Sequence, residues 1–347
     1  MARRLQLVWL AIAFLALLGL GSLVPVLASV LDLAMPFFGI IGLGFFCGRL
    51  MNIPEEGLQW MHFFAIYIAL PGLFFNLVSQ TPFAELSNIA FITTTTVSTY
   101  TIYTLAFGIG LYVTRGNIRS AAIQALAGSY SNIGYMGPAL TLATLGPAAA
   151  APTALIFMFD NILFFSLTPL MMAVGGTSES HIFSTIWAVF KKIALSPFII
   201  AVVLGIASAY FQIHPPVAIQ KMLAFLQNAA APSALFIMGV TVALRPVTRI
   251  APEIPVLLGI KLVVHPLFVW LLLSVIGGFD RVWTFTAVLM AALPPGLNVF
   301  VMATQYGVYV ERASSVVLFG TIASVITVTA LLYGISQGLL PVNLLAR

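Results

Sequence analysis

Charged residues are scarce in this sequence. Of its 347 residues only 7% are Asp, Glu, Lys or Arg, whereas 61% are hydrophobic. A soluble globular domain carries about 25% charged residues, so a water-soluble fold is excluded. Long polar loops are absent too, since no connection between apolar stretches exceeds about fifteen residues.

Cysteine and clustered histidine are also lacking. Cys47 is the only cysteine and the four histidines are scattered, which excludes an intramolecular disulfide and gives no metal-ligand spacing. We therefore expect no metal and no cofactor. The net charge of +5 does not indicate nucleic-acid binding, because the basic residues are spread over many loops and form no patch.

Long apolar stretches fill the rest of the chain. About 20 apolar residues cross a hydrocarbon core of ~30 Å, and we count eleven stretches of that kind. They fall at 6–28, 30–50, 58–79, 86–113, 118–146, 149–173, 187–211, 217–244, 253–276, 281–306 and 311–337. The sequence thus predicts an all-α, multi-pass protein of the lipid bilayer.

The distribution of basic residues predicts its orientation, because short cytoplasmic loops retain Lys and Arg. With the amino terminus inside, ten of the fourteen basic residues are cytoplasmic: Arg3, Arg4, Arg49, Arg115, Arg119, Lys191, Lys192, Arg245, Arg249 and Arg312. Only Lys221, Arg281 and Arg347 fall outside, and Lys261 lies within a span. This asymmetry is typical of a cell inner-membrane protein.

Residues 1–29 form an extra amino-terminal hydrophobic segment. Arg3 and Arg4, the apolar run Leu5–Leu20 and the small residues up to Ala28 also fit a secretory signal. A retained helix, a removed signal and a misassigned start codon all stay open. The orientation of the later spans is the same in each case.

The chain resembles itself at an offset of 161 residues. The matching pairs are Pro36 and Pro197, Phe37 and Phe198, Gly44 and Gly205, Pro71 and Pro232, Phe75 and Phe236, and Gly146 and Gly307. Residues 30–174 and 187–340 would then be two repeats of five spans. Because five is odd, the second repeat must enter the membrane from the opposite side, and inverted repeats are typical of secondary transporters.

The fourth span of each repeat contains strong helix breakers. These are SNIGYMGP at Ser131–Pro138 and LPPGLN at Leu293–Asn298. Proline lacks an amide donor and clashes with the preceding turn, so each span is predicted to split into two half-helices. Unwound backbone in hydrocarbon is tolerated only beside protein or water, which indicates a cavity. The alternative is a simple proline kink, as expected at Pro36, Pro71, Pro197, Pro232 and Pro266.

The ends of these half-helices predict an anion site. Proline favours the first helical turn, so the second halves should begin near Pro138 and at Pro294 or Pro295. The amides expected to be unpaired are those of Ala139, Leu140, Gly296 and Leu297. Two such ends, each equivalent to roughly half a positive charge, would offset about one carboxylate. Asn132 and Asn298 would add donors, cap the half-helices, or do both.

Ionisable residues inside spans mark candidate pathways. Asp160 could bind a coupling proton or cation, or serve as a structural carboxylate. Lys261 and His265 are four residues apart and share a helical face; Lys261 would either hold a second anionic group or reach toward the cytoplasmic surface. An intramembrane hydrolase would need a nucleophile with a base or a paired aspartate. Only Asp160 lies deep in a span, so an enzyme is not predicted.

Three sequence stretches resemble the auxin efflux carrier family. They are SNIGYMGPALTLATLG, LPPGLNVFVMATQYGVYVERASSVVLFGTIASVIT and ALPGLFF at Ala69–Phe75. The resemblance covers about Leu31–Leu340, and bacterial members of the family include malonate transporters. It implies ten core helices in two inverted repeats of five, with two crossed broken helices, a scaffold domain and a transport domain.

The resemblance also implies a substrate site. Its members in this sequence are Asn132, Gly134, Gly137, Pro138, Pro294, Pro295 and Asn298, with Gly296 between them. The two asparagines are the implied anion contacts, and homodimerisation is implied by analogy. Two features depart from the family: residues 1–29 precede its usual start, and the long central loop of plant members is reduced to Gly175–Ile186.

These observations predict a secondary active transporter of a small organic anion, such as a carboxylate, working by alternating access. Two alternatives stay open. A sodium-coupled symporter of the bile-acid type would share the architecture and need cation ligands near the crossover. A passive anion channel would lack saturable counterflow. The coupling ion, proton or sodium, is not fixed by the sequence.

Overall fold

The computed structural model describes residues 32–51, 55–176, 194–213, 215–244 and 251–345, with a few single positions between 187 and 191. The predictions for residues 1–29 and most of Gly175–Ile186 lie outside the described residues. In the described part every regular element is a helix, which confirms the all-α class.

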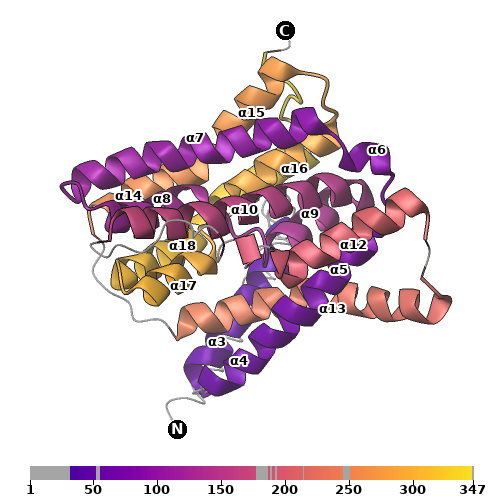
Figure 1. The fold of residues 1–347 in the computed structure, drawn as a ribbon, viewed down its shortest axis with the longest axis horizontal. Coiled ribbons are helices and arrows are strands. Elements are labelled where there is room, and N and C mark those ends of the chain that lie inside the picture. The colour runs from indigo at the N-terminus through magenta and orange to yellow at the C-terminus, as the bar shows by residue number, and fades with distance from the viewer. Residues whose placement is uncertain are drawn as a thin grey trace, which may run out of the picture.

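Within the described stretches the helices follow one another with short connections (Figure 1). The first half contains η1 Met35–Gly39, α3 Ile40–Met51, α4 Glu55–Phe63, η2 Phe64–Ala69, α5 Leu70–Ser79, α6 Phe83–Leu86, α7 Ile89–Val113, α8 Ile118–Ser129, α9 Gly137–Leu145, η3 Pro147–Ala149 and α10 Ala150–Val174. The second half contains α12 Pro197–Phe211, α13 Val217–Ala243, α14 Glu253–Gly259, η4 Ile260–Val264, α15 His265–Ile276, α16 Arg281–Ala292, α17 Leu297–Tyr306 and α18 Val310–Ser336.

Six continuous stretches of the described chain are long and apolar enough to cross a bilayer. They are Asp32–Met51, Gly57–Ser79, Pro147–Val174, Val217–Ala243, Glu253–Ile276 and Val310–Ser336. The protein is therefore a multi-pass membrane protein.

The other predicted spans have different fates. Helix α7 has 25 residues, whereas the described helix in the stretch 187–211 is α12, with 15 residues. The stretches 118–146 and 281–306 are each divided between two helices. The stretch 6–28 lies outside the described residues.

Side-chain caps fix where several helices begin. The side chains of Asn88, Asn117 and Asp280 accept hydrogen bonds from backbone amides in the first turns of α7, α8 and α16, at 3.1, 2.9 and 2.9 Å. Each bond satisfies an amide that has no partner within its helix. The residue at which each of these helices begins is thus set by its own capping side chain.

Two of the predicted proline kinks follow π-helical segments. Pro71 is the second residue after η2, and Pro266 is the second residue after η4. A proline leaves the carbonyl four residues earlier without its usual donor, and here these carbonyls belong to Tyr67 and Leu262, inside the π segments. The wider π turn is a local way to accommodate the proline.

Glycines allow two helix pairs to approach closely. A Cβ on Gly44 of α3 would lie 2.2 Å from the carbonyl oxygen of Phe236 in α13. A Cβ on Gly205 of α12 would lie 2.9 Å from the Cβ of Val78 and 3.3 Å from the carbonyl oxygen of Phe75, both in α5. Small residues at such contacts are how membrane helices gain packing energy.

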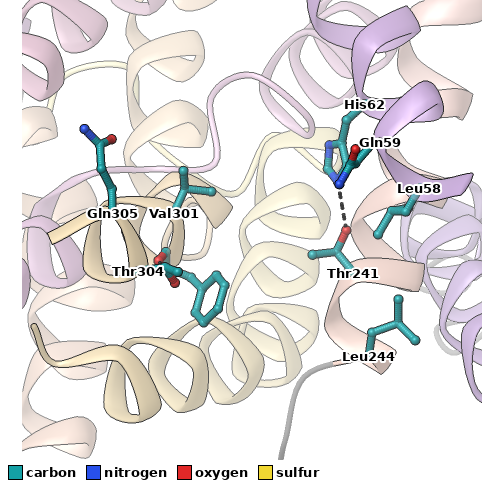
Figure 2. A pocket seen from close by; sticks show the side chains of 9 residues that line it. Leu58, Gln59, His62, Thr241, Leu244, Val301, Thr304 and Gln305 are labelled. Atoms are coloured by element: carbon teal, nitrogen blue, oxygen red, sulfur yellow. Dashed lines mark hydrogen bonds between the residues drawn. The ribbon is translucent and has the colours of Figure 1, made fainter. Parts of the chain in front are cut away.

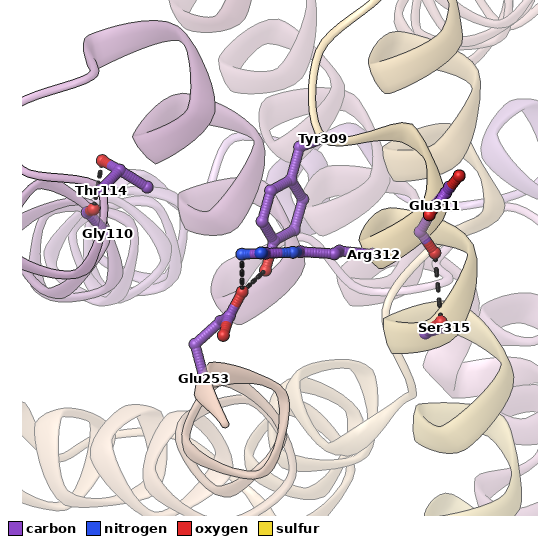
Figure 3. A network of polar contacts seen from close by, with 7 residues as sticks. All are labelled: Gly110, Thr114, Glu253, Tyr309, Glu311, Arg312 and Ser315. Carbon is purple, nitrogen blue, oxygen red and sulfur yellow. Dashed lines mark hydrogen bonds and ion pairs between the residues drawn. The ribbon is translucent and has the colours of Figure 1, made fainter. Parts of the chain in front are cut away.

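A polar network joins the beginnings of α14 and α18 (Figure 3). Buried Glu253 accepts hydrogen bonds from Arg312 at 2.6 Å and from the Tyr309 hydroxyl at 2.9 Å. The guanidinium also lies over the Tyr309 ring, 5.6 Å from its centroid. Burial and the neighbouring carboxylate raise the pKa of Tyr309, so its hydroxyl stays a donor at neutral pH.

We expect Gly44→Ala to destabilise the protein by about 1–3 kcal/mol, because the new methyl group overlaps a backbone carbonyl that cannot move freely. Gly42→Ala is the matched control, since a Cβ on this glycine of the same helix meets no atom within 4 Å. Thermal unfolding of both purified variants in detergent measures the difference. Equal melting temperatures would contradict the close contact.

Candidate functional site

Two helix interruptions meet at the centre of the molecule. Helix α8 ends at Ser129 and α9 begins at Gly137, while α16 ends at Ala292 and α17 begins at Leu297. In Figure 1, α8 and α17 lie toward the left and α9 and α16 lie to the right of them. The unwound segments 130–136 and 293–296 thus lie between four half-length helices.

The two unwound segments hydrogen-bond to each other. The amide of Asn132 donates to the carbonyl of Pro294 at 2.8 Å, and the amide of Gly296 donates to the carbonyl of Tyr130 at 3.1 Å. Ser131 and Pro295 form an isolated antiparallel bridge between these bonds. Backbone groups that would be costly in lipid are therefore satisfied within the protein.

Gly296 is required by this pairing. A Cβ there would lie 2.9 Å from the Tyr130 ring and 3.1 Å from the carbonyl oxygen of Ser131. Its backbone has φ −66°, so the requirement is for space and not for an unusual conformation.

In the second half of the chain, the predicted start of the second half-helix is wrong. Pro138 lies in the first turn of α9, as expected. Pro294 and Pro295, however, belong to the unwound segment, and α17 begins only at Leu297. Two amides expected to be unpaired have partners, because Leu140 donates to Met136 at 2.9 Å and Gly296 donates to Tyr130.

A central cavity of about 180 Å³ adjoins the paired segments. Of the predicted site residues, Asn132, Gly134, Gly296 and Asn298 line it, while Gly137, Pro138, Pro294 and Pro295 shape the backbone behind it. Aromatic side chains complete the wall: Tyr130, Tyr135, Phe157, Phe165 and Phe198. No basic or acidic residue is among the described residues that line it.

A chain of hydrogen bonds crosses this wall. Asn298 Nδ2 lies 3.4 Å from the hydroxyl of Tyr130, and that hydroxyl donates to Asn161 Oδ1 at 3.0 Å. Asn161 Nδ2 in turn donates to the Phe157 carbonyl at 2.8 Å. Sequence reasoning missed Tyr130 as a site residue, although it directly precedes the SNIGYMGP motif.

The asparagines do not cap the half-helices. The amino-terminal caps are Met136 for α9 and Gly296 for α17, and neither helix start receives a side-chain cap bond. Asn132 is buried and its Nδ2 lies 2.8 Å from the sulfur of Met238. Ser131 beside it has a buried hydroxyl without a hydrogen-bond partner in the described structure.

The electrostatics of the cavity come from backbone and amide dipoles. Leu297 and Asn298, at the start of α17, line the cavity; the first amides of a helix have no acceptor within it, and such helix starts attract anions. Asn132 and Asn298 add neutral donors to the cavity wall. A cavity with this lining can hold a small anion without a cationic side chain.

Asp160, Lys261 and His265 gather in a separate place. Asp160 and His265 line a void of about 10 Å³ with Thr95 and Thr99, which is room for at most one water molecule. The Thr99 hydroxyl lies near the carboxylate, and Lys261 interacts with it electrostatically. None of the three lines the central cavity.

The expectation that Lys261 reaches the cytoplasmic surface is wrong. Its side chain is fully buried, and its ammonium donates to the carbonyl of Ala291 and lies 3.4 Å from His265 Nδ1. Ala291 is in the last turn of α16, where a cation stabilises the negative end of the helix dipole. The half-helix end, and not the membrane surface, holds this charge.

A larger outer cavity of about 430 Å³ lies between α4, α13 and α17 (Figure 2). Its polar lining comprises Gln59, His62, Thr241, Thr304 and Gln305. His62 lines this cavity and contacts a residue of the central one, because its Nδ1 lies 3.0 Å from the hydroxyl of Tyr135. No sequence motif pointed to His62.

Comparison with known proteins places the sequence among transporters. A family described as membrane transport protein matches residues 29–332. A Rhizobium meliloti (strain 1021) protein, provisionally named a malonate transporter, is 46% identical over 318 residues, covering 92% of this chain and 99% of that protein. An uncharacterized transporter of Methanothermobacter thermautotrophicus (strain Delta H) is 23% identical over 83% of this chain and 92% of its own. Auxin efflux carrier component 5 of Arabidopsis thaliana is 26% identical over 48% of each chain.

We expect Lys261→Met to destabilise the fold by about 1–3 kcal/mol, because it leaves the buried Ala291 carbonyl without its donor and removes the favourable electrostatic interaction with Asp160. Asp160→Asn together with Lys261→Met should recover part of that loss. Thermal unfolding of the two single variants and the double variant gives the coupling free energy. Strictly additive effects would contradict an interaction between the two side chains.

Proposed function

Since the chain belongs to the membrane transport protein family that includes the auxin efflux carriers, we propose that it is a secondary active transporter of a small organic anion. The observation that carries the proposal is the central cavity, where two helix interruptions and two asparagines meet. None of the described residues that line it is charged. The site is built to attract a carboxylate through oriented dipoles.

The substrate class follows from the size and lining of the cavity. Its volume of about 180 Å³ suits an anion of a few carbon atoms, and its aromatic wall favours a compact apolar body between polar ends. The relative provisionally named a malonate transporter covers nearly the whole chain. We therefore propose short mono- and dicarboxylates as the substrates to test first.

We propose that the two halves form an inverted repeat. Gly44 contacts Phe236, and Gly205 contacts Phe75. Each of these residues is 161 positions from its counterpart in the other contact, so the contacts are reciprocal, as a two-fold axis requires. Five spans in each half would place this axis in the membrane plane.

The same axis supports a crossover of the two interrupted helices. Helices α8 and α16 have 12 residues each, and each begins with a side-chain cap and ends at an unwound segment. Backbone hydrogen bonds between the two unwound segments join the two halves of the chain at this place. We propose alternating access by movement of this crossover against the glycine-packed helices α3, α5, α12 and α13.

Asp160 is the proposed coupling group, and a proton is the proposed coupling ion. Its carboxylate is buried beside Thr99 and Lys261, and the adjacent void has few oxygen atoms to replace the hydration shell of a cation. A nearby ammonium group also opposes a bound cation. The sodium-coupled alternative has no carboxylate among the described residues of the central cavity.

Replacement of Asn132 or Asn298 by Ala should reduce uptake at least tenfold, because each removes an amide donor from a water-poor cavity. Uptake of labelled acetate, malonate and succinate is measured in proteoliposomes under imposed proton, sodium and voltage gradients. Asn343→Ala is the matched control, since Asn343 bonds the Ser274 carbonyl away from the cavity. Normal uptake by both site variants would refute the site, and absence of saturable counterflow would favour a channel.

Asp160→Asn should abolish accumulation driven by a proton gradient while counterflow of pre-loaded substrate persists, because exchange needs no net proton movement. The comparison is made in the same proteoliposomes. Sodium-driven uptake that survives in this variant would show that coupling resides elsewhere.

A further inference from the structure

The outer cavity is not accounted for by the anion site. It is larger than the central cavity, and none of the described residues that line it is acidic. Its walls offer hydroxyl, amide and imidazole groups from α4, α13 and α17, which Figure 2 shows facing one another across the space. Such neutral groups can donate hydrogen bonds to a hydrated anion.

Helix α17 connects the two cavities. Asn298, in its first turn, lines the central cavity, whereas Phe300, Val301, Thr304 and Gln305 further along it line the outer cavity. One helix thus forms a continuous wall from the interrupted segments outward.

A polar contact joins a residue that lines the outer cavity to one that lines the central cavity. His62 lines the outer cavity and Tyr135 lines the central one. The imidazole Nδ1 lies 3.0 Å from the tyrosine hydroxyl, and the two rings meet edge to face with centroids 6.1 Å apart.

The orientation of His62 is set by α13. The Thr241 hydroxyl donates its only hydrogen to the Ile237 carbonyl at 2.8 Å, so it accepts from His62 Nε2, 3.3 Å away. In a neutral imidazole the other nitrogen is then an acceptor, and Nδ1 receives the hydroxyl hydrogen of Tyr135. Helix α13 of the glycine-packed group thereby orients a side chain of α4 that contacts the interrupted segment.

We infer that the outer cavity is the cytoplasmic vestibule of the anion pathway and that the His62–Tyr135 contact is its inner gate, an inference that rests on the proposed function. Leu244 at the rim of the cavity directly precedes the basic stretch that begins at Arg245, and basic residues mark the cytoplasmic side. The gate joins α4 to the segment 130–136, so opening must break this bond and the ring contact.

Cysteine accessibility tests the gate without relying on transport. In a Cys47→Ser background, which has no other cysteine, Ser131→Cys reports on the central cavity and Thr304→Cys on the outer one. A membrane-impermeant methanethiosulfonate reagent is added from the cytoplasmic side. We expect rapid labelling at 304 and slow labelling at 131.

His62→Ala should speed labelling at position 131 at least tenfold and leave position 304 unchanged, since it removes both bonds of the imidazole. Tyr135→Phe keeps the ring and removes one hydrogen bond, so we expect a rise of about fivefold. Gln59→Ala is the matched control, because Gln59 lines the same cavity one turn before His62, and labelling at 131 should stay at the parent rate.

Three results would overturn the gate. They are equal labelling at 131 and 304 in the parent, no rise at 131 in either gate variant, or an equal rise with Gln59→Ala. Uptake measured on the same samples keeps the two proposals apart: a protein that shows the gated labelling but carries no anion retains the gate and loses the transport function.

Discussion

The arrangement depends on one constraint, the need of every backbone amide and carbonyl for a partner where water is absent. Two stretches of this membrane protein leave the helical conformation, and each would be costly on its own. They satisfy each other instead, through the bonds of Asn132 with Pro294 and of Gly296 with Tyr130. The cavity lined by asparagines exists because this mutual pairing makes unwound backbone tolerable beside it.

Basic residues follow a related logic. Lys261 donates to a carbonyl in the last turn of α16, Arg119 to the carbonyl of Tyr306 at the end of α17, and Arg281 to the carbonyl of Ile335 at the end of α18. The last carbonyls of a helix lack intrahelical donors, and a cation there also offsets the helix dipole. These three charges are therefore explained by the helix ends that they serve.

Composition and apolar length were sufficient to predict an all-helical membrane protein, and the clusters of Gly, Pro and Asn located both helix interruptions. The exact start of α17 was not predictable, because Pro295 can begin a helix or pair in an extended segment, and the bridge to Ser131 decides between them. The position of Lys261 was also beyond reach, since burial and snorkelling share one sequence pattern. His62 gave no signal because its partners lie 73 and 179 residues away.

The close contacts of carbonyl oxygens with Gly44 and Gly205 restrict how the packed helices can slide. A helix face that meets a bare backbone this closely cannot shear past it without bringing a side chain into the oxygen. These contacts thereby hold α3 against α13, and α12 against α5, as two rigid helix pairs. Any displacement of the interrupted helices would therefore occur at the contacts around these helix pairs, where side chains and not bare backbone meet.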